Sequence, residues 1–149
     1  MKPINEMTVS FPSCSANESF GRAAVAAFAA QLDPTIDELS DMKTAVSEAV
    51  TNCIVHAYRN TLGTIYITCK LYENGRISIR IRDKGCGIED IEQAMQPLFS
   101  TSEDEERAGL GFAVMESFMD VLRVTSKPGR GTSVTMSKTI QRRRTEKNH

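Results

Sequence analysis

The sequence predicts an α/β two-layer sandwich in which helices cover one face of a mainly antiparallel sheet. Two neighbouring runs, residues 65–72 and 77–82, alternate strictly between apolar and polar side chains, as strands with one buried face do. Residues 42–57 instead place their apolar side chains along one helical face. We find no internal repeat or linker, so the 149 residues are expected to form one domain, ordered over about 7–140.

The first predicted elements are a strand and a helix. Residues 7–11 alternate weakly and predict an edge strand. Ser15 and Glu18 have the spacing of a capping box, and the alanine-rich run after them predicts a helix that continues to Leu32.

A second helix and a hairpin follow. In Asp33-Pro34, an N-cap residue precedes a proline at the first helical position, which predicts a helix that continues to about Tyr58. Asn74-Gly75 separates the two alternating runs and predicts a two-residue hairpin turn, because both central residues of such a turn take positive φ.

The C-terminal half predicts shorter elements. A short helix is expected over residues 89–95, and an acidic stretch without a clear period follows it. Residues 109–120 predict a helix, and residues 121–126 and 132–140 predict two strands. Residues 141–149 are polar and basic and are expected to form a tail.

Composition excludes several classes of protein. The formal charge of −1 and the isoelectric point near 6.1 provide no global field that would attract nucleic acid or an acidic membrane. The first eleven residues lack an apolar signal segment, and no run reaches membrane-spanning length, so we expect a cytoplasmic protein. The four cysteines form no CxxC pair, which argues against a zinc site; Cys53 and Cys69 fit core positions.

Glu48 and Asn52 are the first candidate site residues. Four residues apart on a helix, they lie along one line of its surface, beside the predicted apolar face. An amide oxygen suits Mg²⁺, which takes one or two protein ligands plus phosphates, and a carboxylate one turn away can accept a proton. The alternative is an ordinary solvated helix flank.

Asp83, Gly85 and Gly87 follow the end of a predicted strand. A carboxylate at that place can accept a hydrogen bond from an exocyclic amine such as that of adenine. Glycines allow positive φ and a close approach of the backbone to a ligand. An ordinary turn remains the alternative.

Gly109 and Gly111 open the last predicted helix, whose N-terminal amides would form a phosphate cradle. The long segment before them, residues 88–108, has the length of a functional lid. Within its irregular part Arg107 is the lone cation and could reach a terminal phosphate, or it could pair with a neighbouring glutamate.

Thr132 follows Gly131 at the start of the last predicted strand, and its hydroxyl is expected to join the hydrogen bonds around Asp83. Each of these blocks alone is commonplace. Their order and number together predict a site for ATP and a hard metal ion.

These blocks resemble the N, G1, G2 and G3 boxes of the GHKL superfamily, which includes DNA gyrase B, the ninety-kilodalton chaperone, histidine kinases and MutL. The resemblance implies the Bergerat fold, which binds Mg-ATP under a mobile lid. It also implies that Asn52 is the magnesium ligand, Glu48 the catalytic base and Asp83 the adenine contact. The nucleotide loops would contain four glycines: Gly85, Gly87, Gly109 and Gly111.

Residues 27–58, 81–102 and 106–126 are similar to the anti-sigma-factor serine kinases of spore-forming bacteria, the anti-sigma F family. The likeness extends from about Met7 to Ile140. It implies a homodimer that binds ATP or ADP with Mg²⁺, holds the sporulation sigma factor F away from RNA polymerase, and phosphorylates a serine of an anti-anti-sigma partner. It implies no direct contact with nucleic acid or membrane.

One departure concerns the lid. Relatives often have a lysine where this chain has Ser102, so contact with the terminal phosphate would depend more on Arg107. The resemblance does not account for the basic run at residues 142–144.

Three alternative functions have sequence requirements of their own. A histidine kinase needs a phosphoacceptor histidine on a separate helix pair, and the chain has only His56 and His149. A gyrase-like or MutL-like ATPase needs a further domain after Ile140. A nucleotide-dependent module that sequesters a partner without phosphate transfer would have no use for Glu48 as a base, although geometry decides catalysis.

Overall fold

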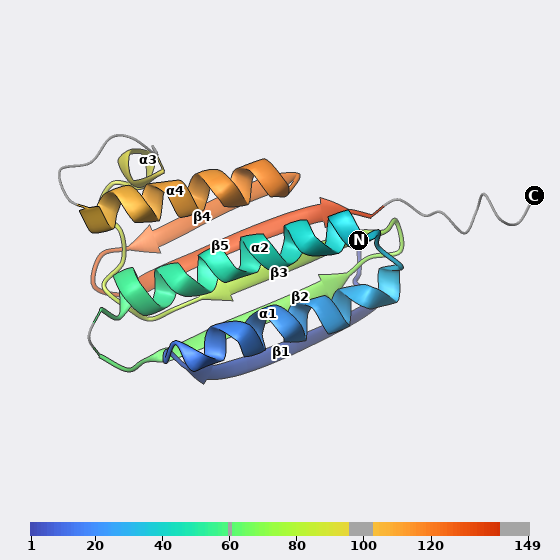
Figure 1. Ribbon diagram of the computed structural model, residues 1–149, viewed down its shortest axis with the longest axis horizontal. Helices are drawn as coiled ribbons and strands as arrows, with labels where there is room; N and C mark the ends of the chain where they lie inside the picture. Colours follow the sequence, from blue (N-terminus) through green and yellow to red (C-terminus); the bar gives the residue numbers. More distant parts are fainter. Residues whose placement is uncertain (60, 96–102, 141–149) are drawn as a thin grey trace, which may run out of the picture.

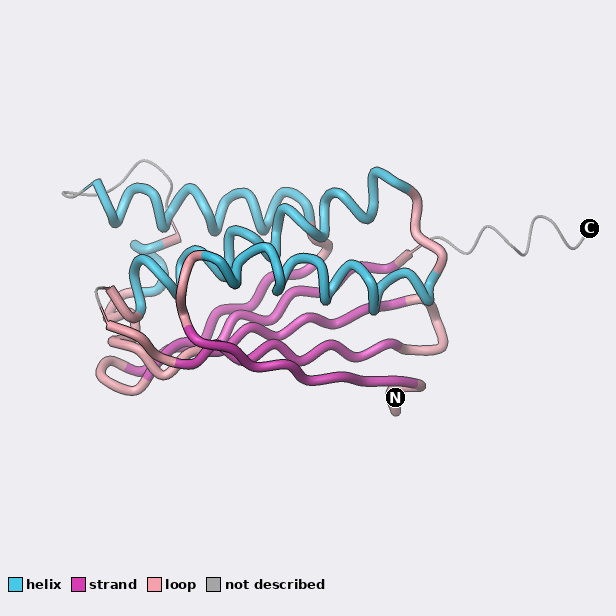
Figure 2. The backbone as a smooth tube through the Cα atoms, turned by 60° about the horizontal axis from the view of Figure 1, so that its bottom comes forward, coloured by secondary structure: helices cyan, strands magenta, loops and turns pink. Residues whose placement is uncertain are grey.

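The computed structural model describes residues 1–59, 61–95 and 103–140, and for 103–108 it describes the backbone alone. Five antiparallel strands form one sheet in the order β1-β2-β3-β5-β4. The helices lie on one face of this sheet (Figures 1 and 2). The two-layer sandwich predicted from the sequence is therefore confirmed.

The elements follow the predicted order. Their bounds are β1 Asn5–Pro12, α1 Ala16–Ala29, the 3₁₀ turn η1 Ala30–Leu32, α2 Ile36–Asn52, the π-helical turn η2 Cys53–Ala57, β2 Thr64–Leu71, β3 Arg76–Arg82, α3 Ile91–Ala94, α4 Glu103–Phe118, β4 Val121–Lys127 and β5 Gly131–Thr139.

The core lies between the helices and the inner face of the sheet. The alternation predicted for β2 and β3 is confirmed, because every second residue of these strands is buried. The fully buried residues of these two strands are Ile65, Ile67, Cys69, Leu71, Ile77, Ile79 and Ile81. Val46 and Val50 of α2 and Met115 of α4 are also fully buried, and together these apolar side chains hold the two layers together.

Both predicted N-caps differ in the structure. Ser15 occupies the N-cap position of α1, but its side chain makes no capping hydrogen bond. Helix α2 begins after Thr35, and Thr35 and Glu38 form a full capping box. Asp33 cannot be the N-cap because its left-handed conformation, with φ of 53°, ends η1 instead.

The second helix also ends differently from the prediction. It is α-helical only to Asn52, and a π-helical turn continues it to Ala57. The amide of Tyr58 donates to the carbonyl of Cys53, five residues back, at 3.1 Å. Isolated π-helical turns of this kind are frequent at functional sites.

The β2–β3 hairpin is built on three loop residues, 73–75, and not on two. Only Gly75 has positive φ (88°), and Asn74 does not. The amide of Gly75 donates to the Tyr72 carbonyl at 3.0 Å, and the amide of Tyr72 donates to the Arg76 carbonyl at 2.9 Å. This pattern fits a type I turn followed by a glycine bulge.

The segment before the last helix is more regular than predicted. Helix α4 begins at Glu103, six residues before Gly109, and α3 covers only Ile91–Ala94. The other part of the predicted lid, residues 96–102, and the tail, residues 141–149, lie outside the described residues. Within the described part of the chain, no helix has the length and apolar character needed to cross a membrane.

The capping geometry yields a stability prediction. Thr35→Ala removes the side-chain acceptor of the Glu38 amide and should lower the free energy of unfolding by about 1 kcal/mol, measured by urea denaturation. Ser15→Ala is the matched control at the other helix start, where no capping bond is lost, and should change it by less than about 0.5 kcal/mol. Equal effects of the two substitutions would contradict this assignment of the caps.

Candidate functional site

The predicted site residues gather at one end of the molecule. The C-terminal end of α2, the loop after β3, the turn between β4 and β5, and the first half of α4 all reach this end (Figure 1). Segments far apart in the sequence thus meet in one candidate functional region.

Glu48 and Asn52 face Gly111 of α4. A methyl group built on Gly111 would lie 3.1 Å from Glu48 Oε2 and 3.3 Å from both polar atoms of the Asn52 amide. Ala49, Val50 and Cys53 beside them are buried, so the pair lies at the margin of the core. Glycine at position 111 leaves room for these two side chains between α2 and α4.

Asn52 carries an unsatisfied polar atom. Its Nδ2 is buried and has no hydrogen-bond partner, and it is the only such buried side-chain atom among the described residues. Buried polar groups are nearly always paired, since leaving one unpaired costs about 1–3 kcal/mol. A hydrogen-bond acceptor at this point, such as a phosphate oxygen, would satisfy this N–H donor.

The donor set around Asn52 suits a cation that brings its own ligands. Within the ranges that the structure describes, no three His, Cys, Asp or Glu side chains gather as a metal cage. One amide and one neighbouring carboxylate fit Mg²⁺, which keeps waters and shares phosphate oxygens.

Asp83 is a buried carboxylate at the end of β3, only 5% exposed. Its Oδ1 accepts hydrogen bonds from the amides of Gly85 at 2.9 Å and Thr132 at 3.2 Å. Burial raises the pKa of this carboxyl above 3.8, while the two amides and the thiol of Cys53 act in the opposite direction. The result is an oriented acceptor in a site largely shielded from water.

The buried Cys53 thiol lies against the Asp83 carboxylate. Burial, and then the negative charge of Asp83, raise the pKa of this thiol well above its ordinary value. The thiol therefore stays protonated and can donate to the carboxylate. As predicted, Cys53 belongs to the core, but its contact with Asp83 is not apparent from the apolar pattern of the helix.

Glycines in this region bring backbone segments together. A side chain on Gly85 would clash with the carbonyl of Ala57, and one on Gly87 with the carbonyl of Lys127. Gly87 also has a φ of 75°, which favours glycine. These two glycines therefore allow the loop after β3 to pack between η2 and the β4–β5 turn.

Thr132 contacts Asp83 through its backbone and not through its hydroxyl. The hydroxyl pairs with Ser126 at 2.8 Å, and Ser126 accepts a hydrogen bond from the amide of Ile88 at 2.7 Å. Sequence reasoning did not identify Ser126, because its role depends on the register that pairs it with Thr132.

Gly109 and Gly111 lie inside α4 and do not open it. The prediction that their amides form the N-terminal cradle of this helix is wrong for this conformation, because the helix begins at Glu103. Gly109 is buried, and Gly111 faces Glu48. Arg107 lies in the first half of α4, and its side chain is outside the described residues.

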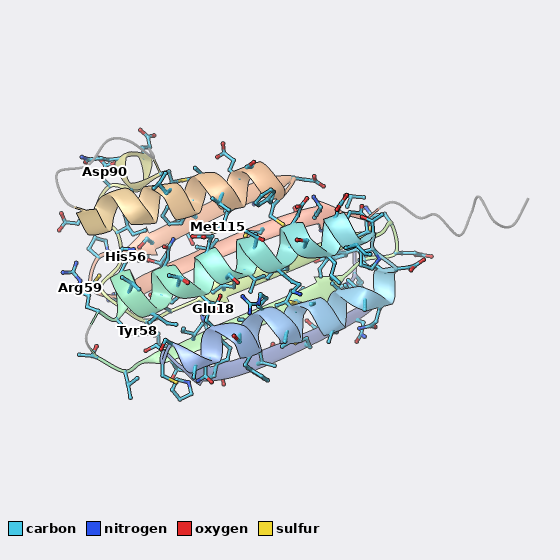
Figure 3. The ribbon with its side chains drawn as sticks, viewed as in Figure 1. Glu18, His56, Tyr58, Arg59, Asp90 and Met115 are labelled. Carbon is cyan, nitrogen blue, oxygen red and sulfur yellow. The ribbon has the colours of Figure 1, made fainter. Side chains whose placement is uncertain are left out.

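Tyr58 is a second residue that the sequence did not identify as part of the site. It lies directly after η2, at the same end of the molecule as His56 and Arg59 (Figure 3). Its hydroxyl accepts a hydrogen bond from the amide of Lys84, next to Asp83, at 2.7 Å. An aromatic residue at a helix end, followed by a turn, was the only sequence signal.

Comparison with known proteins shows the family of this chain. Residues 15–138 match the family of histidine kinase-like ATPase domains. The chain is 61% identical to the anti-sigma F factor of Caldanaerobacter subterraneus subsp. tengcongensis, over 97% of this chain and 100% of that protein. It is 56% identical to the anti-sigma F factor of Clostridium beijerinckii, over 90% of this chain and 94% of that protein.

Solved structures share the fold at lower identity. The RsbU and RsbW domains of a Mycobacterium tuberculosis protein match with a TM-score of 0.67 and 18% identity, over 93% of this chain and 33% of that longer chain. The histidine kinase domain of a blue-light-activated kinase from Erythrobacter litoralis matches with a TM-score of 0.57 and 18% identity, over 86% of this chain and 63% of that chain.

The burial of Asp83 predicts a pH-dependent stability difference. The folded-state pKa of Asp83 is raised above 3.8. Between 3.8 and the raised pKa, the folded protein binds more protons than the unfolded chain, so the free energy of unfolding falls as pH rises through this range. Asp83→Asn keeps an oxygen for the Gly85 and Thr132 amides and removes the charge. The variant should therefore gain stability relative to wild type as pH rises from acidic to neutral.

Urea denaturation at several pH values measures this difference. Asp90→Asn is the charge control, because Asp90 is an exposed N-cap that asparagine replaces equally well. A difference between wild type and Asp83→Asn that stays constant with pH would disprove the prediction.

Proposed function

Because the chain belongs to the anti-sigma F factor family of histidine kinase-like ATPase domains, we propose that it is a protein serine kinase that uses Mg-ATP. It also binds the sporulation sigma factor F and keeps it from RNA polymerase. The kinase acts on a serine of an anti-anti-sigma partner. The observation that carries the catalytic part is that the Asn52 amide and the Glu48 carboxylate lie together opposite Gly111, one helical turn apart. The unpaired Asn52 Nδ2 is a donor that suits a phosphate oxygen, and its Oδ1 is the atom that could bind a cation.

Asn52 would hold Mg²⁺ together with phosphate oxygens, and the ion would neutralise charge on the phosphates. No acidic cage competes for the cation among the described residues. Gly111 keeps the space in front of Asn52 clear, because any larger residue would approach both its amide atoms and Glu48.

Glu48 is the proposed general base. It accepts the proton of the serine hydroxyl as the serine oxygen bonds to the γ-phosphorus and the bond to the ADP oxygen breaks. A carboxylate at the margin of the core, within reach of solvent, can take up and release that proton. Arg107 is the proposed contact of the terminal phosphate.

Asp83 is the proposed adenine contact. Two backbone amides orient its carboxylate, and the buried surroundings strengthen a hydrogen bond from the 6-amino group of the base. Gly85 and Gly87 shape the loop that holds it, and Thr132 supports it through its backbone.

The partner assignments rest on the family. The relatives are named for sigma factor F, and they match this chain over nearly their whole length. A homodimer in the cytoplasm, without direct contact to nucleic acid or membrane, is part of the same proposal. ADP would remain in the site after each transfer.

Phosphate transfer tests the enzyme. Wild type should transfer label from γ-labelled ATP to the purified anti-anti-sigma protein in an acid-stable form. Glu48→Gln should lower the transfer rate about a hundredfold or more while ATP still binds, because the base is lost and the shape is kept. Asp37→Asn, an exposed carboxylate in the first turn of the same helix, is the control and should keep the rate.

The absence of transfer by a folded wild type that binds ATP would exclude the kinase. The protein would then be a nucleotide-dependent module that sequesters its partner. Retention of the full rate by Glu48→Gln would exclude Glu48 as the base.

Metal dependence tests Asn52. Asn52→Ala should weaken binding of Mg-ATP about tenfold or more, and should weaken binding of metal-free ATP much less. Thr51→Ala, at the exposed neighbouring position of α2, is the control and should change neither. Calorimetry with and without Mg²⁺ measures both affinities, and equal losses for Asn52→Ala would argue against metal ligation.

A further inference from the structure

We propose that Tyr58 is a positioning residue whose hydroxyl sets the Asp83 carboxylate for a 6-aminopurine, and that it thereby determines the preference for adenine. The inference rests on the proposed function, in which Asp83 contacts the base. The selectivity of that contact would then depend on a residue whose hydroxyl bonds to backbone atoms of Thr64 and Lys84.

The Tyr58 hydroxyl connects two chain segments. It donates to the carbonyl of Thr64, at the start of β2, at 2.6 Å. It accepts from the amide of Lys84 at 2.7 Å. Burial raises the pKa of this hydroxyl, so the proton that it gives to Thr64 stays in place. The side chain is only 9% exposed, so water competes little for either bond.

The bond to Lys84 holds the peptide unit that follows Asp83. On one side of this unit, the Lys84 amide is bound to Tyr58. On its other side, the Asp83 carbonyl packs so closely against Gly131 that no side chain fits there. The Asp83 amide itself donates to the Thr132 carbonyl at 2.9 Å. The backbone on both sides of the carboxylate is thereby fixed.

The π-helical turn places the Tyr58 ring. The Tyr58 amide bonds to the carbonyl of Cys53, five residues back, and its carbonyl accepts from the hydroxyl of Thr61 at 2.7 Å. The ring lies over Gly63, where any side chain would clash with it. In an uninterrupted α-helix, Tyr58 would be turned around the helix axis by about 100° for each residue of shift in its position. Its hydroxyl would then point away from Lys84.

Two more contacts tie the same turn to the same loop. The Cys86 amide donates to the Ala57 carbonyl at 3.0 Å, and the Cys53 thiol lies against the Asp83 carboxylate. Of these attachments, only the Tyr58 hydroxyl can be removed without changing volume or backbone. Tyr58→Phe keeps the ring over Gly63 and releases the Lys84 amide.

Releasing this amide should affect ligands selectively. The Gly85 and Thr132 amides still bind the carboxylate, but the peptide that follows Asp83 is no longer held and must be ordered when the base binds, which lowers affinity. Only a base with an amino group at position 6 uses this carboxylate in the proposed site. ATP binding should therefore weaken, whereas binding of purine riboside triphosphate, which lacks the amino group, should not.

The experiment compares these two nucleotides on the full chain by calorimetry in the presence of Mg²⁺. Wild type should bind ATP more tightly than purine riboside triphosphate. Tyr58→Phe should lower the ATP affinity about fivefold and leave the analogue unchanged, so that the preference for ATP shrinks by the same factor. Tyr72→Phe is the matched control, because Tyr72 stacks with Arg76 in the β2–β3 hairpin, and it should retain the wild-type preference.

The outcomes separate the inference from the proposed function. Equal binding of both nucleotides by wild type would exclude Asp83 as the adenine contact, and it would therefore also exclude the role of Tyr58. A wild type that prefers ATP, together with a Tyr58→Phe variant that prefers it equally, would overturn the inference alone. If Tyr58→Phe weakened the binding of both nucleotides equally, the inference would also be overturned, because Tyr58 would then have only a structural role.

Hydrogen exchange of wild type gives a second measurement that needs no variant. Lys84 is exposed, yet its amide should exchange slowly because the buried Tyr58 hydroxyl accepts from it. Exchange at the rate of a free amide would overturn the inference even if Tyr58→Phe did not fold.

Discussion

Contact between backbones around the loop after β3 is the constraint on which the rest of the site depends. Gly85 lies against the carbonyl of Ala57, Gly87 against that of Lys127, and Gly131 against that of Asp83. Three segments far apart in the sequence therefore meet with no side chain between them. This packing places the end of η2, the end of β3 and the β4–β5 turn in fixed relation, and it permits the amides of the loop and of β5 to bind the Asp83 carboxylate.

The site is built from groups that are unfavourable for folding. Asp83 is a carboxylate held away from water, and Asn52 keeps a buried amide without a partner. Each group lowers stability unless something polar binds to it. The burial of the alternating faces of β2 and β3 beneath the helices offsets this cost, and the same two buried polar groups are the candidate contacts for a ligand. Stability is thus concentrated in the sheet and its helical cover, and binding capacity at one end of them.

The fold was largely predictable because it depends on periodic burial. Strict alternation identified β2 and β3, and the helical spacing of apolar residues identified α2 and the core position of Cys53 in η2. The errors lie at element ends. Asp33 is a residue type that N-cap positions prefer, but it takes a left-handed conformation. Asn74 does not take the positive φ of a two-residue turn. Such choices depend on where the chain must go next, which local preferences do not specify.

The sequence by itself determined the candidate residues of the site. Glu48, Asn52 and Asp83 carry oxygen groups suited to a metal-bound nucleotide, and the glycines that follow them in the chain permit close backbone contact. Only the tertiary structure decided how they act together. It placed Gly111 inside α4 opposite Glu48 and Asn52, turned the Thr132 hydroxyl toward Ser126, and brought the Tyr58 hydroxyl to the peptide beside Asp83. The physical reason is that residue type sets what a group can bind, whereas its actual partner depends on strand register, on one π-helical turn and on backbone contacts between distant segments.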